Sequence, residues 1–150
     1  MGRWLGIDHG HKRIGLAVGD TQARMASPVG MASAERHDTV EQILAMARDY
    51  QVEGLLVGWP INADGSEGPQ GVMARRFASE LAKQTKLPVR IWDERLSSFV
   101  ADQALRGLLT RKKKRARQDA IAAAAFLQDF LSRDGEQTAH APDDLPWPQE

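Results

Sequence analysis

The sequence predicts an α/β domain built on a mixed five-stranded sheet with helices on both faces. Its first two apolar segments are joined by a short turn, so the two strands must pair in antiparallel fashion. Apolar segments then alternate with amphipathic ones, which indicates parallel β-α-β units. The length of 150 residues fits one ordinary domain with a sizeable core.

The antiparallel opening comprises residues 3–8 and 13–19, and a weakly marked third strand lies near residues 25–31. Right-handed crossovers should place the later strands beside the first. In sheets of this kind the reactive crevice lies beyond the carboxyl ends of the strands. Residues that directly follow a strand are therefore the first candidates for chemistry.

A helix should begin at Asp38 or Thr39, because either side chain can cap it, and should run to about Tyr50. Residues 54–58 form a continuous apolar run, which is typical of a strand covered on both faces. Repeated Gly and Pro then indicate a loop over residues 59–71.

The second half begins with a helix over residues 72–84, in which Arg75, Arg76 and Lys83 are expected to face solvent. The next strand is expected over residues 87–93.

Two further helices are expected before the tail. Ser97 or Ser98 can cap the first, which should run to about Leu109. A basic segment, residues 111–117, is expected to separate it from a last helix over residues 119–132.

The formal net charge of zero conceals an uneven distribution. Residues 134–150 contain five acidic residues and no Lys or Arg, so residues 1–133 carry a net charge of +5. The proline-containing acidic segment cannot continue a helix, and we expect a mobile, solubilising tail after a domain over residues 1–133. The alternative is that the tail folds back on the basic segment.

The composition indicates the cellular compartment in which the protein works. The chain has no cysteine, which excludes disulfides and zinc–thiolate sites and fits a reducing environment. It lacks an apolar run of membrane-spanning length, and its first residues do not resemble a secretory signal. We therefore expect a cytoplasmic protein that does not enter a membrane.

Three acidic residues stand where strands end or a helix begins: Asp8, Glu94 and Asp119. If the fold gathers them, they form an oxygen-rich pocket suited to Mg²⁺ or Mn²⁺. Asp8 could instead cap a turn. Asp93 competes with Glu94, but Glu94 is favoured because it is longer and lies at the very end of its strand; Asp93 could instead pair with Arg95.

Asp119 begins a helical stripe. Ala123, Phe126 and Phe130 follow it at helical spacing, so its side chain should point toward the core. The alternative is an acid at the helix N-terminus that favours the helix dipole.

The segment from Arg111 to Arg117 carries six positive charges in seven residues. Such density leading into a candidate metal ligand suggests contacts with the phosphates of a nucleic acid, although a solvated loop is the simpler explanation. His9 and His11 lack partners at metal-ligand spacing and are expected in a surface turn. The loop from Trp59 to Ser66 could contact a nucleotide or could be an ordinary turn.

Four ordered segments resemble the YqgF/RuvX family. They are the opening from Asp8 to Ala17, the central loop with Val57 to Pro60 and Asn62 to Ser66, the D-E-R-L-S segment from Asp93 to Ser97, and the D-x-x-A-A element from Asp119 to Ala123. The resemblance covers residues 4 to about 131 and does not extend to the tail.

The resemblance implies a ribonuclease H-like fold in which the first strand neighbours the fourth. It implies catalytic and metal-binding roles for Asp8, Glu94 and Asp119, with Mg²⁺ or Mn²⁺ as cofactor. Asp8 would bridge two ions and the other two acids would hold one each. Phosphate-binding candidates are Lys12, Arg13, Arg95, Arg111, Lys112, Lys113, Lys114, Arg115 and Arg117.

The implied activity is phosphodiester hydrolysis in branched DNA, as a Holliday junction resolvase, or in precursor rRNA, at the 5′ end of pre-16S rRNA. A resolvase makes two cuts related by two-fold symmetry, so that substrate implies a homodimer. The alternatives are a nucleic-acid-binding module without catalysis and a phosphotransferase of the actin-like superfamily. The latter fold needs two lobes of this kind, whereas this chain has room for one.

Overall fold

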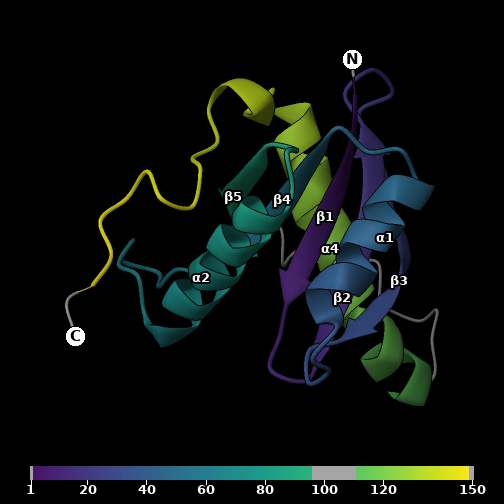
Figure 1. The fold of residues 1–150 in the computed structure, drawn as a ribbon, viewed down its shortest axis with the longest axis horizontal. Coiled ribbons are helices and arrows are strands. Elements are labelled where there is room, and N and C mark those ends of the chain that lie inside the picture. Colours follow the sequence, from purple (N-terminus) through teal and green to yellow (C-terminus); the bar gives the residue numbers. More distant parts are fainter. Residues whose placement is uncertain (1, 96–110, 149–150) are drawn as a thin grey trace.

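The computed structural model describes residues 2–95 and 111–148, which form one five-stranded sheet with helices on its two faces (Figure 1). The predicted strands and the order of elements are confirmed within these residues. The elements are β1 (Arg3–His9), β2 (Arg13–Asp20), β3 (Met25–Ser33), α1 (Thr39–Asp49), β4 (Gly54–Trp59), α2 (Pro69–Gln84), β5 (Val89–Asp93), α4 (Arg111–Ser132) and the short 3₁₀ helix η1 (Gly135–Gln137).

The sheet is mixed, as predicted. Its strand order is β3-β2-β1-β4-β5. β1 pairs antiparallel with β2 and parallel with β4, and β5 continues the parallel side. The first strand therefore lies beside the fourth, and the carboxyl ends of β1, β4 and β5 meet at one edge of the molecule.

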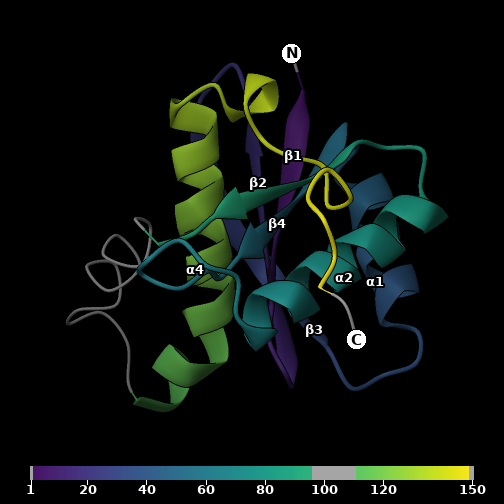
Figure 2. The same cartoon turned by 90° about the vertical axis from the view of Figure 1, so that its left-hand side faces the viewer.

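The sheet separates two apolar layers (Figure 2). Leu5 and Ile7 of β1 face the layer covered by α1 and α2. Trp4 of the same strand faces α4, where it packs against Phe130 with ring centroids 4.9 Å apart. This alternation follows from the two-residue period of a strand, and it decides which side chains can meet α4.

The N-terminus of α1 lies where the sequence places it, but the side chain of Asp38 does not cap the helix. Asp38 occupies the N-cap position without a capping hydrogen bond from its side chain. Its carboxylate instead accepts hydrogen bonds from Arg36 and Gln42. Because the Asp38 carboxylate is bound to the Arg36 guanidinium, it does not accept a hydrogen bond from a backbone N–H of the helix.

The last helix differs from the prediction. α4 begins at Arg111, so the basic segment expected as a loop forms the first turns of the helix. Lys, Arg, Ala and Gln are good helix formers, and no Gly or Pro interrupts residues 111–132. Asp119 is therefore an internal residue of α4 rather than its N-terminal residue. The expected helix from Ser97 or Ser98 lies outside the described residues.

The expected exposure of Arg75 is wrong. α2 begins at Pro69, inside the predicted loop, because proline suits the first turn of a helix. Arg75 is only 1% exposed, although Arg76 beside it is exposed. Its guanidinium bonds Glu67 at 2.7 Å and three backbone carbonyls of residues 142–146. These partners are distant in sequence, so the helical pattern alone does not reveal them.

The segment after α4 lies against the domain. Glu136 accepts a hydrogen bond from the Trp4 indole at 2.8 Å, and the Ile91 backbone N–H donates to the His140 carbonyl beside β5. The described tail residues therefore contact the sheet, α2 and α4. Within residues 2–95 and 111–148, every helix is too short or too polar to span a lipid bilayer.

Candidate active site

The candidate site lies at the carboxyl ends of β1, β4 and β5. Ile7 of β1 pairs with Val57, and Gly58 of β4 pairs with Trp92. Asp8 therefore reaches the level of Gly58 from one side, and Glu94 follows β5 on the other. Strand alternation places both acids on the face of the sheet that α4 covers.

Gly58 leaves the space that Glu94 occupies. A Cβ at this position would collide with Glu94 Oε2 and would lie 2.6 Å from the Phe126 ring of α4. The Glu94 carboxylate therefore lies over the backbone of β4, between the sheet and the helix. A glycine is required here because helix, strand and carboxylate converge on one point.

The environment of Glu94 opposes its ionisation. Burial, and then the charge of neighbouring Asp93, raises the pKa of Glu94 from 4.5 to about 7. Two negative groups beside a core cost free energy unless a cation offsets them. The arrangement thus favours either a proton or a metal ion on this carboxylate.

Asp93 has a different set of contacts. Its carboxylate accepts from Arg95, with an Nη2–Oδ2 distance of 2.7 Å and a second bond from Nε at 2.9 Å. The same guanidinium donates to the carbonyls of Asn62 and Ala63. Asp93 therefore pairs with Arg95, as the sequence allowed, and Arg95 in turn holds the loop after β4. Glu94 is the acid directed toward α4.

The backbone of α4 brings Asp119 toward the same point. Trp4 lies beside Phe130, and a Cβ on Gly6 would lie 3.1 Å from the Ala123 carbonyl. The two elements therefore run in opposite directions, and the carboxyl end of β1 lies near the start of α4. Asp119 occupies the helical turn before Ala123, at the level that follows Gly6. Its side chain lies outside the described part of the structure.

The oxygen-rich donor set suits a hard divalent cation. Asp8 and Glu94 supply two carboxylates, and carboxylates are the usual protein ligands of Mg²⁺ and Mn²⁺. Among the side chains that the structure describes, no three His, Cys, Asp or Glu residues form a metal site. A complete site of the predicted kind therefore needs the third acid, Asp119.

The positive candidates divide between two elements at this end of the molecule. Lys12 and Arg13 are exposed in and after the β1–β2 turn, which follows Asp8 directly. The six basic residues of the segment from Arg111 to Arg117 lie in the first turns of α4, which start beyond the same strand ends (Figure 1). Arg95 belongs to the loop contact described above.

His9 departs from a simple surface turn. Its ring stacks on Phe77 of α2, with centroids 4.2 Å apart, and burial followed by the nearby His11 charge lowers the pKa of His9. Its Nδ1 is buried and lacks a hydrogen-bond partner among the described atoms. The apolar stripe of α2 gives no signal for this contact, since His9 and Phe77 are far apart in sequence.

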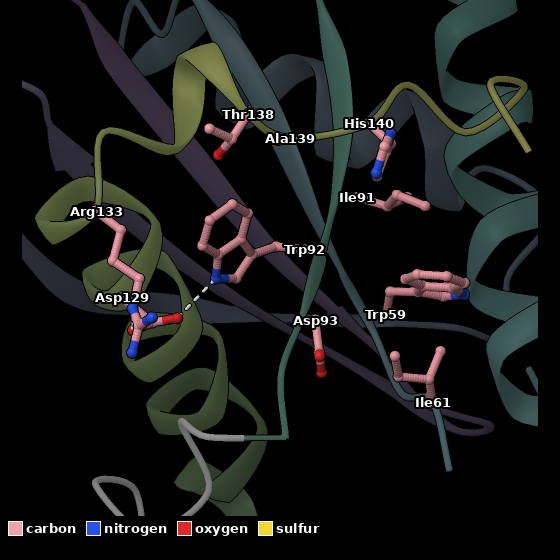
Figure 3. A pocket seen from close by; sticks show the side chains of 10 residues that line it. All are labelled: Trp59, Ile61, Ile91, Trp92, Asp93, Asp129, Arg133, Thr138, Ala139 and His140. Carbon is pink, nitrogen blue, oxygen red and sulfur yellow. Dashed lines mark hydrogen bonds and ion pairs between the residues drawn. The ribbon is translucent and has the colours of Figure 1, made fainter. Parts of the chain in front are cut away.

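A cleft of about 460 Å³ adjoins the site along the outer edge of β5 (Figure 3). Trp59, Ile61 and Trp92 supply much of its apolar wall, and Asp93, the residue before Glu94, also lines it. The Trp92 indole donates to Asp129 of α4 at 2.9 Å, and Asp129 also pairs with Arg133. Sequence reasoning did not find this cleft because the tail supplies part of its wall.

Comparison with known proteins decides the family. The model described as "RuvX: Holliday junction resolvase" matches residues 2–133. The chain belongs to this family. Curated relatives named "Putative pre-16S rRNA nuclease" are 46% identical over 86% of this chain and 96% of the relative in Anaeromyxobacter sp. strain Fw109-5, and 38% identical over 89% and 85% in Rhodobacter capsulatus.

Solved structures agree on the fold of this RuvX-family chain. Thermus thermophilus RuvC bound to a Holliday junction has 19% identity and a TM-score of 0.52, with 91% of this chain and 97% of that chain covered. The fowlpox virus Holliday junction resolvase has 10% identity and a TM-score of 0.53, with 87% and 99% covered. The predicted ribonuclease H-like fold is confirmed.

Gly58→Ala tests the packing of the site. The added methyl group must displace Glu94 or the Phe126 ring, so we expect a loss of about 1–3 kcal/mol in the free energy of unfolding. Urea unfolding measures it. Gly30→Ala is the matched control, because its nearest contact would be Met46 Cε at 4.0 Å. Equal stability of the two variants would contradict the crowding at Gly58.

The raised pKa of Glu94 predicts a pH dependence of stability in the presence of a chelator. Between pH 4.5 and about 7 the folded state binds the extra proton, so raising the pH should lower the free energy of unfolding. Relative to Glu94→Gln, the wild type should lose up to about 3 kcal/mol across this range. Urea unfolding at several pH values measures the difference.

The control for that experiment is Glu41→Gln, at an exposed position of α1. It should keep the wild-type pH dependence. If Glu94→Gln also keeps it, the buried carboxyl group does not titrate as inferred.

Proposed function

We propose that this RuvX-family protein is a metal-dependent nuclease that hydrolyses phosphodiester bonds in structured nucleic acid. The observation that carries the proposal is the convergence of Asp8 and Glu94 around Gly58, under the helix that carries Asp119. Family membership supports the same activity. Catalytic roles are therefore assigned to Asp8, Glu94 and Asp119.

The chain's own groups have separate tasks. Asp8, at the carboxyl end of the central strand of the sheet, would be the ligand shared by a pair of metal ions, and Glu94 and Asp119 would each hold one. When bound, two divalent ions supply an activated water and stabilise the leaving oxygen. The raised pKa of Glu94 means that metal binding must displace a proton near neutral pH. Metal affinity should therefore increase with pH through this range.

Substrate binding is assigned to the positive groups around the strand ends. Lys12, Arg13 and the basic start of α4 can neutralise phosphates on either side of the scissile bond. The helix presents this charge on a regular scaffold that leads directly to Asp119. Arg95 would act at the same end, where it also holds the loop after β4.

Two nucleic acids are candidates for the substrate. The names of the curated relatives favour precursor 16S rRNA, and the description of the family model favours a Holliday junction. A junction would need two sites related by two-fold symmetry, hence a homodimer, whereas RNA trimming can use one chain. Either substrate places the protein in the cytoplasm, in accord with its lack of cysteine.

The two substrates are separated by offering the purified protein a four-way DNA junction and a precursor rRNA in parallel with Mn²⁺. Symmetric incision of the junction assigns a resolvase, and shortening of the RNA at its 5′ side assigns an rRNA-processing nuclease. Cleavage of neither substrate would contradict the proposed function.

Asp8→Asn should abolish metal-dependent cleavage while leaving nucleic-acid binding largely intact, because it removes the shared ligand but no positive charge. Cleavage of either substrate and binding by fluorescence anisotropy measure the two effects. Asp49→Asn, at an exposed position at the end of α1, is the control and should cleave normally. Wild-type cleavage by Asp8→Asn would remove Asp8 from the mechanism.

Neutralising Lys112, Lys113 and Lys114 to Gln should weaken binding and reduce the slope of log affinity against log salt by about 2–3. The control neutralises three exposed positive residues elsewhere, Arg48, Lys83 and Lys86. That variant should keep the wild-type slope. An unchanged slope in the α4 variant would place the phosphate contacts on other elements.

A further inference from the structure

The buried guanidinium of Arg75 uses all five of its N–H donors. Nε and Nη2 donate to the two carboxylate oxygens of Glu67 at 2.7 and 2.9 Å. Nη1 donates to the carbonyls of Pro142 and Leu145, both at 2.9 Å, and Nη2 also donates to Pro146 at 2.8 Å. A fully occupied guanidinium fork of this kind fixes its partners in direction as well as distance.

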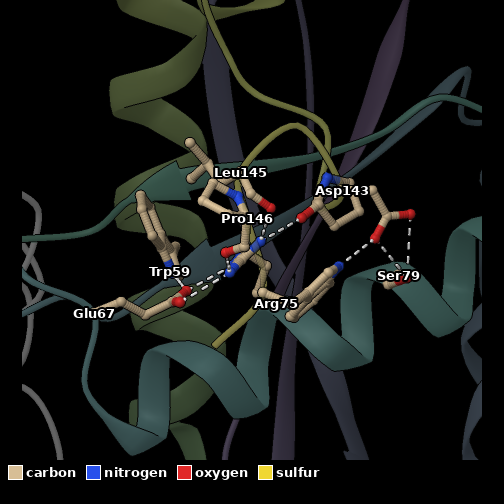
Figure 4. A network of polar contacts seen from close by, with 9 residues as sticks. Trp59, Glu67, Arg75, Ser79, Asp143, Leu145 and Pro146 are labelled. Carbon is tan, nitrogen blue, oxygen red and sulfur yellow. Dashed lines mark hydrogen bonds and ion pairs between the residues drawn. The ribbon is translucent and has the colours of Figure 1, made fainter. Parts of the chain in front are cut away.

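The C-terminal segment closes over this group (Figure 4). The Trp147 ring covers Arg75, with its centroid 3.9 Å from the guanidinium carbon. The Trp147 indole donates to Asp143 at 3.1 Å, and the same carboxylate accepts from the Ser79 hydroxyl at 3.1 Å. Residues 142–147, which we call the strap, are thus attached to two successive turns of α2.

Glu67 transmits this attachment to the site. The oxygen of Glu67 that accepts from Arg75 Nε also accepts from the Trp59 indole at 2.8 Å. Trp59 is the last residue of β4 and directly follows Gly58, over which the Glu94 carboxylate lies. The hydrogen bond from Arg75 is the largest cause of the lowered pKa of Glu67, and it keeps this carboxylate ionised.

The loop that begins at Trp59 is held at its other side by Arg95. This guanidinium donates to the carbonyls of Asn62 and Ala63 at 3.3 and 3.2 Å and is paired with Asp93. The loop, residues 60–68, therefore lies between two anchors, the strap with Arg75 and the end of β5. The second anchor, Asp93 with Arg95, flanks Glu94 in the sequence.

The strap lies beyond residues 2–133, the part of the chain that the family model matches. We infer that the strap positions the site: by closing over Arg75 it holds Glu67 and Trp59, and thereby sets the loop 60–68 beside Asp93 and Glu94. This inference rests on the proposed function for its catalytic consequence. Arg75 is a positioning residue in this scheme and does not touch the substrate.

A chain that ends after Ala141 lacks the strap, and a chain that ends after Pro148 is its matched control. Two-dimensional ¹H–¹⁵N spectra report the indole N–H signals of the four tryptophans. In the shorter chain we expect the Trp59 indole and the loop amides of Gly65 and Ser66 to shift. The Trp4 and Trp92 indoles, which bond Glu136 and Asp129, should stay in place and show an intact fold.

Cleavage kinetics test the consequence for the site. Loss of the strap should lower kcat/KM by about tenfold, with the larger part in KM, because the loop orients the substrate rather than reacting with it. Trp147→Ala should also lower kcat/KM. Trp147→Phe, which keeps a ring over Arg75, should retain most of the wild-type kcat/KM. These two variants also serve if the shortened chain does not fold.

Unchanged Trp59 and loop signals in the shortened chain and in Trp147→Ala would overturn the inference, as would wild-type kcat/KM when those signals do shift. If the full-length protein cleaves no nucleic acid, the proposed function fails by itself. The spectra then still decide whether the strap holds the loop.

Discussion

The close approach of α4 to the glycines of β1 and β4 is the constraint on which the site depends. Gly6 and Gly58 lack the Cβ atoms that would keep the helix away, and the small Ala123 completes the contact. Only when α4 lies this close to the sheet can an acid on the helix and acids at the strand ends bind the same metal ion. The same closeness shields Glu94 from water, so packing and electrostatics have a common origin.

Gathering carboxylates in such a place opposes folding unless a cation compensates them. The raised pKa of Glu94, caused by burial and by the charge of Asp93, reflects this cost. Asp93, one residue away, avoids the cost by pairing with Arg95 at the surface. Two neighbouring acids thus acquire different tasks, one holding a loop and one directed at the proposed metal, because strand alternation sends them to opposite faces.

The sequence was sufficient for the sheet, because apolar runs and turns are local signals, and for the positions of Asp8 and Glu94 at strand ends, because both come at the end of such segments. It was insufficient where partners are remote. Arg75 looks solvent-facing on its own helix, but Glu67, three carbonyls 67–71 residues away and the Trp147 ring enclose its guanidinium. The basic segment was expected as a loop, yet long charged side chains allow helix formation, and α4 therefore begins eight residues before Asp119.

The proposed binding of divalent cations by Asp8, Glu94 and Asp119 together can be measured in a crystal structure with Mn²⁺ recorded at a wavelength where manganese scatters anomalously. We expect anomalous peaks between the ends of β1 and β5 and α4, within about 2.0–2.3 Å of carboxylate oxygens of all three residues. Peaks confined to other sites, or none at these carboxylates at millimolar Mn²⁺ and pH 8, would contradict it.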